Sequence, residues 1–301
     1  MTDASQSLPT GLQKWLVGAR PRTLPAAFVP VAVGGACAAG SEGTVWWRLG
    51  LALVVSLALQ VGVNYANDYS DGVRGTDENR VGPLRLVGSG AAAPGAVKRA
   101  AFVSFAVAAT AGLALAMLTS LWLLAVGAAA LVSAWTYTGG PRPYGYAGLG
   151  EVFVFVFFGI VATVGSQYAV SETVTPTAWI ASIAVGAYAC ALLVINNLRD
   201  IPGDTVAGKR TLAVRMGDTN TRRFFAVLVL VAFAAVIATS ITAGAFAMLG
   251  LVGVVTIKPS LDAIAGGARG QGLVPVLGAV GKSQLVFGVT YTAGLVMSLT
   301  A

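Results

Sequence analysis

The sequence predicts an all-α bundle of about nine helices that crosses a membrane several times. Of the 301 residues, 56% are hydrophobic and 10% are charged, and the mean hydropathy is +0.78. A soluble domain has about 25% charged residues, so this composition is typical of a multi-pass membrane protein. The apolar residues form long runs separated by polar segments. We expect a single integral-membrane domain over residues 1–301.

Nine apolar runs approach the length of about 20 residues that a membrane-spanning helix needs. They cover residues 23–40, 47–67, 97–117, 120–138, 148–169, 178–197, 224–242, 244–258 and 283–300. The first run contains Pro25 and Pro30 and lacks a small-residue cleavage site. These features predict an uncleaved helix rather than a signal peptide. The runs 224–242 and 244–258 are separated only by an uncharged turn.

Lysine and arginine are concentrated in alternate loops, which predicts the orientation of the bundle. If residues 1–22 form a cytoplasmic segment, only Arg48 of the 19 Lys and Arg residues falls on the outer side. This is the positive-inside pattern, and it explains the net charge of +7 without a nucleic-acid partner. The loops 68–96, 198–223 and 259–282 are long and lie on the inner side. We therefore expect the functional site on the cytoplasmic face.

Histidine is absent and cysteine is scarce, which excludes several kinds of site. Cys37 and Cys190 both fall inside apolar runs and have no metal-binding spacing, so they are expected to be packing residues. Without histidine there is no haem ligation by His and no His general base. Any acid–base chemistry must use carboxylates, tyrosines, lysine or water.

Two of the inner loops begin with nearly the same motif. Residues 64–75 and 196–208 each place an asparagine, two aspartates and a glycine in the same order, with one extra residue in the second. The aspartates are Asp68, Asp71, Asp200 and Asp204. The two motifs follow the runs 47–67 and 178–197, so we expect a pseudo-repeat with a site between its halves.

The aspartate spacing favours a shared cation. Asp68 and Asp71 are i, i+3, and Asp200 and Asp204 are i, i+4, so each pair projects from one face of a helix. Paired carboxylates repel each other, and a charge within the bilayer costs roughly 2.5–3.5 kcal/mol on insertion scales. Mg²⁺ suits such oxygen ligands because it binds one or two carboxylates together with substrate phosphates. The alternative is a pair of solvated helix ends.

Basic and amide side chains surround the aspartates and would suit a diphosphate held with Mg²⁺. The basic residues are Arg74, Arg80, Arg85, Lys209 and Arg210, and the amides are Asn64, Asn67, Asn196 and Asn197. The amides can orient carboxylates or bind the metal, and Asn64 is a candidate metal ligand. Anchoring at the membrane surface and helix capping are the alternative roles. Asp77 and Glu78 either complete the metal site or are solvated.

The motifs resemble those of the UbiA superfamily of intramembrane aromatic prenyltransferases, and the similarity covers essentially the whole chain. The segments "NDYSDGVRGTD", "GPLRLVGSG" and "NNLRDIPGDTVAGKRTLAVRMG" are most similar to the 1,4-dihydroxy-2-naphthoate polyprenyltransferases of menaquinone biosynthesis. One departure is that Gly75 and Asp77 stand where other branches have a closely following acidic residue.

The resemblance implies Mg²⁺-dependent transfer of a polyprenyl group from polyprenyl diphosphate to 1,4-dihydroxy-2-naphthoate. The carboxylate leaves as carbon dioxide, and the product is demethylmenaquinone. The four aspartates would hold Mg²⁺, and Lys209 and Arg210 would neutralise the diphosphate. Tyr137 and Tyr144 are candidates for an aromatic wall that stabilises the allylic cation. Glu151 would bind a hydroxyl of the acceptor or act as a base, or it is a helix-terminal acid. The polyprenyl tail would stay in membrane lipid.

Other functions remain compatible with parts of the pattern. Within the superfamily, the acceptor would be 4-hydroxybenzoate or haem. The segment "DGVRG" begins like the motif of CDP-alcohol phosphotransferases, but their following residues are missing. Acids at repeat-related helix ends also occur in ion-coupled secondary transporters, although here both clusters lie at the same face. The glycine-rich segment 266–272 is expected to be a flexible loop.

Overall fold

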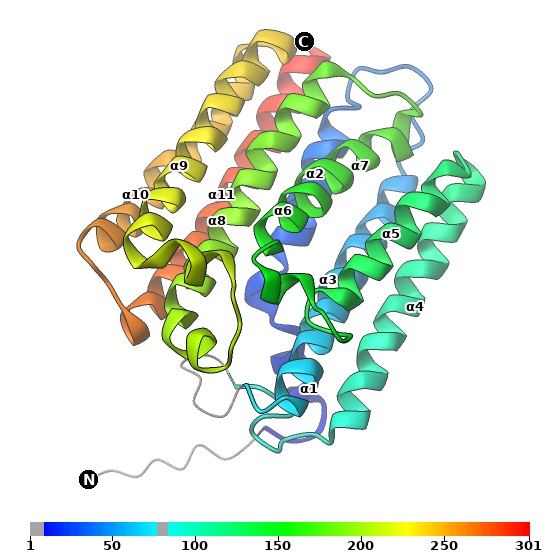
Figure 1. Cartoon of the computed structure of the whole chain (residues 1–301). Coiled ribbons are helices and arrows are strands. Elements are labelled where there is room, and N and C mark those ends of the chain that lie inside the picture. Colours follow the sequence, from blue (N-terminus) through cyan, green and yellow to red (C-terminus); the bar gives the residue numbers. More distant parts are fainter. Residues whose placement is uncertain (1–8, 77–83) are drawn as a thin grey trace.

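A computed structural model describes residues 9–76 and 84–301, and every element within these ranges is helical. Figure 1 shows long helices that lie side by side in a bundle. Among the described residues, seven helical segments are long and apolar enough to cross a bilayer, which indicates a membrane protein. They are α3 (Arg48–Val73), α4 (Pro94–Leu118), α6 to α7 (Gly150–Ser171), α8 (Pro176–Val206), α9 (Leu212–Ala243), η4 to α10 (Ala245–Ala265) and η5 to α11 (Gly270–Thr300). The all-α prediction is confirmed.

Two shorter apolar helices occupy the remaining predicted runs. These are α2 (Pro25–Ala36) and α5 (Trp122–Thr136), with 12 and 15 residues. Both are shorter than the roughly 20 residues that cross a bilayer, so the count of nine spans stays a prediction. Before α2 the chain forms α1 (Gly11–Ala19) and a short 3₁₀ turn, η1 (Pro21–Thr23).

The acidic motifs lie at the ends of α3 and α8, and both helices run further than the predicted apolar runs. Both α3 and α8 continue past their apolar runs, because the helical hydrogen bonds extend until a glycine allows the chain to turn. Gly75 and Gly208 follow the two helices, each with φ of 72°. A positive φ at a glycine just beyond a helix is a common way of ending it. Asp71 and Asp204 are therefore held on the rigid last turns of helices.

The predicted inner loops 198–223 and 259–282 are also wrong in extent. The first contains the end of α8 and the start of α9, and the second contains the end of α10 (Val252–Ala265) and the start of α11 (Leu273–Thr300). Thr211 caps α9, since its side-chain oxygen accepts a hydrogen bond from the amide of Val214 at 3.4 Å. Polar residues thus extend these helices beyond their apolar parts.

Helix α8 forms the core of the bundle, since 78% of the residues in its most apolar 18-residue stretch are buried. It packs against α9, α11 and the π-helix η3 (Phe155–Val161). The π-helix comes very close to α8, because a Cβ on Gly159 would lie 2.6 Å from the Cα of Gly186. Single-turn π segments are frequent at functional sites, and this one lies between α6 (Gly150–Val154) and α7 (Ala162–Ser171).

The contact between α2 and α7 depends on Gly34. A Cβ at this position would lie 2.1 Å from the carbonyl oxygen of Thr163. We expect Gly34→Ala to lower the unfolding temperature of the detergent-solubilised protein by several degrees, because overpacking costs about 1–3 kcal/mol. Gly50→Ala is the matched control, since nothing lies within 4 Å of its added Cβ. An equal unfolding temperature for the two variants would contradict the close contact.

Candidate active site

A large cavity of about 2260 Å³ lies against the ends of α3 and α8. It is larger than the roughly 300–1,000 Å³ of most small-molecule pockets. Its wall combines the acidic helix ends with apolar side chains from α4 and α5, among them Leu113, Leu123 and Leu124. The cavity therefore offers a polar site and a long apolar space to one ligand.

The two acidic motifs meet at Lys209, which lies in the turn between α8 and α9. Its Nζ lies 2.9 Å from Oδ1 of Asp71 and 4.0 Å from Oδ1 of Asp204. One lysine thus contacts an aspartate from each motif, although the motifs are more than a hundred residues apart. The segments expected to form the two halves of a site are therefore in contact.

Asp71 is buried among three cationic or hydrogen-bonding side chains. The hydroxyl of Tyr146 donates to its Oδ1 at 2.6 Å, and Arg85 lies 3.8 Å from its Oδ2. Burial raises the pKa of Tyr146, and the charge of Asp71 raises it further, so the phenol stays a donor. Burial lowers the pKa of Lys209, but the charge and hydrogen bond of Asp71 outweigh this effect and the pKa lies above its usual value. Lys209 is therefore charged at neutral pH.

Asp68 has a different environment from the other aspartates. It is 0% exposed, and its two oxygens accept hydrogen bonds from the backbone amides of Leu86 and Val87, each at 2.9 Å. It does not line the cavity. Its visible role is to fasten the segment that carries Arg85 to the end of α3.

Replacing Asp68 distinguishes this anchoring role from metal binding. In Asp68→Asn, one of the two buried amides loses its acceptor, which costs about 1–3 kcal/mol. We expect a lower unfolding temperature but an unchanged affinity for Mn²⁺, measured by electron paramagnetic resonance. A large loss of Mn²⁺ affinity at an unchanged unfolding temperature would instead make Asp68 a metal ligand.

Asp200 is held by the neighbouring Arg199. The guanidinium donates from Nε and Nη2 to the two oxygens of Asp200, both at 2.7 Å. Nη2 also donates to the side chain of Asn196 at 2.8 Å. The third nitrogen of Arg199, Nη1, is buried and has no hydrogen-bond partner within the described ranges. The arginine fixes the direction of Asp200 toward the cavity that both residues line.

Most of the predicted site residues line this cavity. They are Asn64, Asn67, Asp71, Arg74, Arg85, Tyr137, Tyr144, Asn196, Asn197, Asp200, Asp204 and Lys209. Several are held by hydrogen bonds: Thr138 donates to the side chain of Asn67 at 2.8 Å, and Arg74 donates to the carbonyls of Thr138 and Gly140. The polar wall is therefore fixed before any ligand binds.

Three predicted residues lie elsewhere. Asp68 is behind the wall, as described above. Glu151 is 4% exposed and does not line the cavity; its Oε1 accepts a hydrogen bond from Asn197 at 2.9 Å. Arg210 is exposed and also lies outside the lining. In the segment 266–272, Gly270 and Gln271 reach the cavity. Asp77, Glu78 and Arg80 lie outside the described residues.

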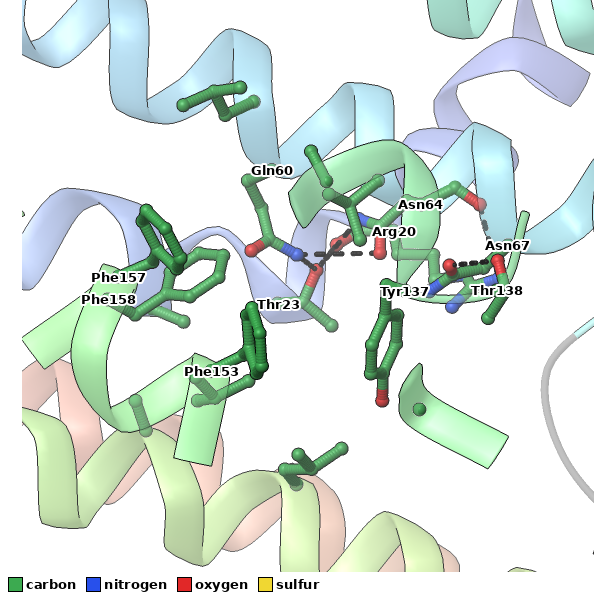
Figure 2. A pocket seen from close by; sticks show the side chains of 18 of the residues that line it. Arg20, Thr23, Gln60, Asn64, Asn67, Tyr137, Thr138, Phe153, Phe157 and Phe158 are labelled. Atoms are coloured by element: carbon green, nitrogen blue, oxygen red, sulfur yellow. Dashed lines mark hydrogen bonds between the residues drawn. The ribbon is translucent and has the colours of Figure 1, made fainter. Parts of the chain in front are cut away.

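Aromatic rings form a continuous row along one wall. The ring centroids of Tyr137 and Tyr144 are 5.4 Å apart, those of Tyr144 and Phe153 are 3.9 Å apart, and those of Phe153 and Phe157 are 6.1 Å apart. Figure 2 shows Tyr137, Phe153 and Phe157 around the pocket. The row runs from the loop after α5 into the π-helix, so the polar end of the cavity continues into an aromatic part.

Four residues of this site were missed in the sequence. Arg199 lies inside the quoted motif "NNLRD", and its position beside Asp200 was a usable signal. Gln60 is an amide in the middle of an apolar run, which is costly in a membrane and often functional. Tyr146 and Thr23 carry no such signal, because their contacts come from segments distant in sequence.

Comparison with known proteins decides the family. Residues 27–261 match the model of the UbiA prenyltransferase family. The chain belongs to the UbiA prenyltransferase family. It is 48% identical to the 1,4-dihydroxy-2-naphthoate octaprenyltransferase of Mycobacterium tuberculosis over 286 residues, which cover 94% of this chain and 96% of that one. It is 40% identical to the enzyme of the same name from Escherichia coli over 232 residues, covering 72% and 73% of the two chains.

Solved structures of UbiA homologs share the fold of this family member. One, from Aeropyrum pernix, matches with a TM-score of 0.71 and 17% identity, covering 89% of this chain and 96% of that one. Another, from Archaeoglobus fulgidus and bound to GPP and Mg²⁺, matches with a TM-score of 0.66 and 15% identity, covering 94% and 99%. The expected prenyltransferase family and UbiA-like fold are thus confirmed.

Proposed function

We propose that this UbiA prenyltransferase transfers a polyprenyl group from polyprenyl diphosphate to 1,4-dihydroxy-2-naphthoate. The observation that carries the proposal is the meeting of two acidic helix ends at Lys209, at the polar end of a large apolar cavity. The relatives with 48% and 40% identity are named for this acceptor. The product would be demethylmenaquinone, as the sequence motifs implied.

The polar end of the cavity suits a diphosphate that arrives with Mg²⁺. Within the described ranges, acidic side chains do not gather in threes close enough to hold a metal by themselves. Mg²⁺ typically takes one or two carboxylates and completes its shell with substrate phosphates and water, so Asp71, Asp200 and Asp204 fit this mode. When bound, the metal supplies charge that neutralises the diphosphate leaving group. Lys209, Arg85 and Arg74 would bind the remaining phosphate oxygens.

The aromatic row suits the cation that forms when the allylic carbon–oxygen bond breaks. The diphosphate leaves with the electron pair of that bond. Tyr137, Tyr144 and Phe153 present π faces that stabilise a nearby positive charge and exclude water from it. The ring carbon of the acceptor then forms the new carbon–carbon bond. The electron pair of its carboxylate bond returns to the ring as carbon dioxide leaves, so no base has to remove a ring proton.

The apolar part of the cavity would hold the polyprenyl tail. Leu113, Leu124 and Val126 line it and are also exposed on the surface of the bundle. In a membrane these residues face lipid, so the cavity would open sideways into the bilayer. At about 0.8 kcal/mol per buried CH₂ group, a tail of several isoprene units is far more stable in lipid than in water.

The acidic helix ends are proposed to lie on the cytoplasmic side, together with the N-terminus. The charge distribution supports this orientation, since only Arg48 falls on the opposite side. Arg48 pairs with Glu172, at the other ends of α3 and α7, through a contact of 2.6 Å. The orientation is tested by labelling single cysteines in sealed membranes. The native cysteines are removed as Cys37→Ser/Cys190→Ser, and one cysteine is introduced as Ser89→Cys or Ser41→Cys.

Product analysis tests the reaction. Purified protein in vesicles is given polyprenyl diphosphate, Mg²⁺ and either 1,4-dihydroxy-2-naphthoate or 4-hydroxybenzoate. We expect a prenylated, decarboxylated naphthol and no turnover after removal of Mg²⁺ with a chelator. Prenylation of 4-hydroxybenzoate alone would assign the chain to another branch of the family. No prenylated product from either acceptor would overturn the proposal.

A further inference from the structure

A polar network at the cavity wall leaves one hydrogen-bonding atom facing the ligand space. The network consists of Gln60 and Asn64 on α3, Thr23 in η1, and the carbonyls of Ala19 and Arg20. Figure 2 shows Gln60 beside Phe157 and Phe158, and the network above Phe153 and Tyr137. Gln60 and Asn64 are only 7% and 3% exposed. The orientation of these two side chains is therefore set by hydrogen bonds within the protein and not by solvent.

The donors of this network are all used internally. Thr23 donates its one hydroxyl proton to the carbonyl of Arg20 at 2.9 Å, so its oxygen can only accept from the two amides. Asn64 Nδ2 donates to that oxygen at 3.0 Å and to the carbonyl of Ala19 at 2.9 Å. Gln60 Nε2 donates to the Thr23 oxygen at 3.1 Å and to Asn64 Oδ1 at 3.4 Å. A primary amide has two protons, so Gln60 has none left for a ligand.

The remaining atom is the side-chain carbonyl oxygen of Gln60. Oε1 accepts no hydrogen bond from any residue that the structure describes, and Gln60 lines the cavity. In Figure 2 this oxygen lies on the side of the phenylalanine rings at 157 and 158. The network prevents the amide from turning its nitrogen outward, because its two hydrogen bonds, to Thr23 and Asn64, would be lost. The wall therefore presents an acceptor only, beside an aromatic surface.

We propose that Gln60 is the residue that selects the acceptor substrate, by accepting a hydrogen bond from a phenolic hydroxyl. This inference rests on the proposed function. In 1,4-dihydroxy-2-naphthoate the 1-hydroxyl donates to the adjacent carboxylate, so the 4-hydroxyl is the donor available to the protein. A carboxylate or a quinone oxygen offers only lone pairs and would be repelled by Oε1. The position thus favours the reduced, electron-rich ring over its oxidised quinone.

Binding of two ligands isolates this hydrogen bond. 1-Hydroxy-2-naphthoate has the same carboxylate and 1-hydroxyl as the substrate and lacks only the 4-hydroxyl. Calorimetric titration into wild-type protein without prenyl diphosphate, under nitrogen, is expected to show about tenfold tighter binding of 1,4-dihydroxy-2-naphthoate. In Gln60→Met the ratio should fall below about twofold. An indirect effect of the mutation would weaken both ligands equally and leave the ratio unchanged, which would overturn the proposal.

Two further variants complete the test. Gln60→Glu keeps an accepting oxygen and is expected to retain the tenfold preference, even if both ligands bind more weakly because of the added charge. Gln284→Met is the matched control, since Gln284 is buried in α11, does not line the cavity and should leave the ratio unchanged. If Gln60→Met does not fold, the proposal still fails when wild type binds the two ligands equally or when Gln60→Glu loses the preference.

The binding test of Gln60 and the product assay of the proposed function can fail independently. The same wild-type preparation is assayed for prenylated naphthol. Product formation together with an unchanged ligand ratio in Gln60→Met would overturn the role of Gln60 and leave the proposed function standing. A binding preference without any product from either acceptor would overturn the proposed function and leave Gln60 as the residue that recognises the hydroxyl.

Discussion

Asp71→Asn is expected to lower prenyl transfer by at least about a thousandfold, because the metal that neutralises the leaving group is worth several kcal/mol. Asp71 is 5% exposed and lies 2.9 Å from Lys209, at the point where the two motifs meet. Asparagine keeps the size of the side chain but removes the charge that Mg²⁺ and Lys209 both use. Turnover of 1,4-dihydroxy-2-naphthoate and Mn²⁺ affinity are measured on the same protein.

The matched control for this variant is Asp262→Asn. Asp262 forms an exposed i, i+4 pair with Lys258 on α10, with 63% of its side chain exposed, and such pairs contribute little. We expect normal turnover and Mn²⁺ affinity. If Asp71→Asn keeps near-normal turnover, or loses turnover without losing Mn²⁺ affinity, Asp71 is not a metal ligand.

Lys209→Met is expected to lower turnover by about 10²–10³-fold, as is usual when one charged donor to a transition state is removed. The Michaelis constant for polyprenyl diphosphate should rise as well, while that for the aromatic acceptor should not. The protein should also unfold at a lower temperature, because Asp71 loses its nearest cation in a buried site. The pKa of Lys209 lies above its usual value of 10.5. The stability that its charge contributes is therefore complete at neutral pH and is lost only as the pH rises through the raised pKa.

Lys258→Met and Lys209→Arg are the control variants for Lys209→Met. Lys258 is 71% exposed, and its loss should change neither activity nor unfolding temperature. Lys209→Arg retains the charge and should recover part of the activity. If Lys209→Met lowers only the unfolding temperature and leaves turnover intact, the lysine holds the two helix ends together without binding the diphosphate.

The amino-acid sequence was enough to predict the class of the protein and the approximate position of its site. Long apolar runs can only be satisfied in a bilayer by helices, because each backbone group must be paired within its own segment. The helices lie close to the predicted runs for this reason. Repeated aspartates at the ends of two such runs are costly, which predicted a ligand shared between them. The two segments are in contact through Lys209.

Which residues of the motifs face the cavity depends on contacts between distant segments. Asp68 and Asp71 read alike in sequence, yet the first binds the backbone of residues 86 and 87 and the second lines the cavity. Glu151 and Arg210 were equally plausible from spacing, but one is paired behind the wall with Asn197 and the other is exposed. Local periodicity gives the face of a helix but not the neighbour that this face meets.

The role of Gln60 also became visible only in three dimensions. In the sequence it is one amide within an apolar run, and its chemistry depends on partners in η1 and at the end of α1. Composition and periodicity determined the membrane fold because they act along the chain, through the solvent each residue requires. The direction of each polar side chain was decided by hydrogen bonds between distant segments, which no single stretch of sequence contains.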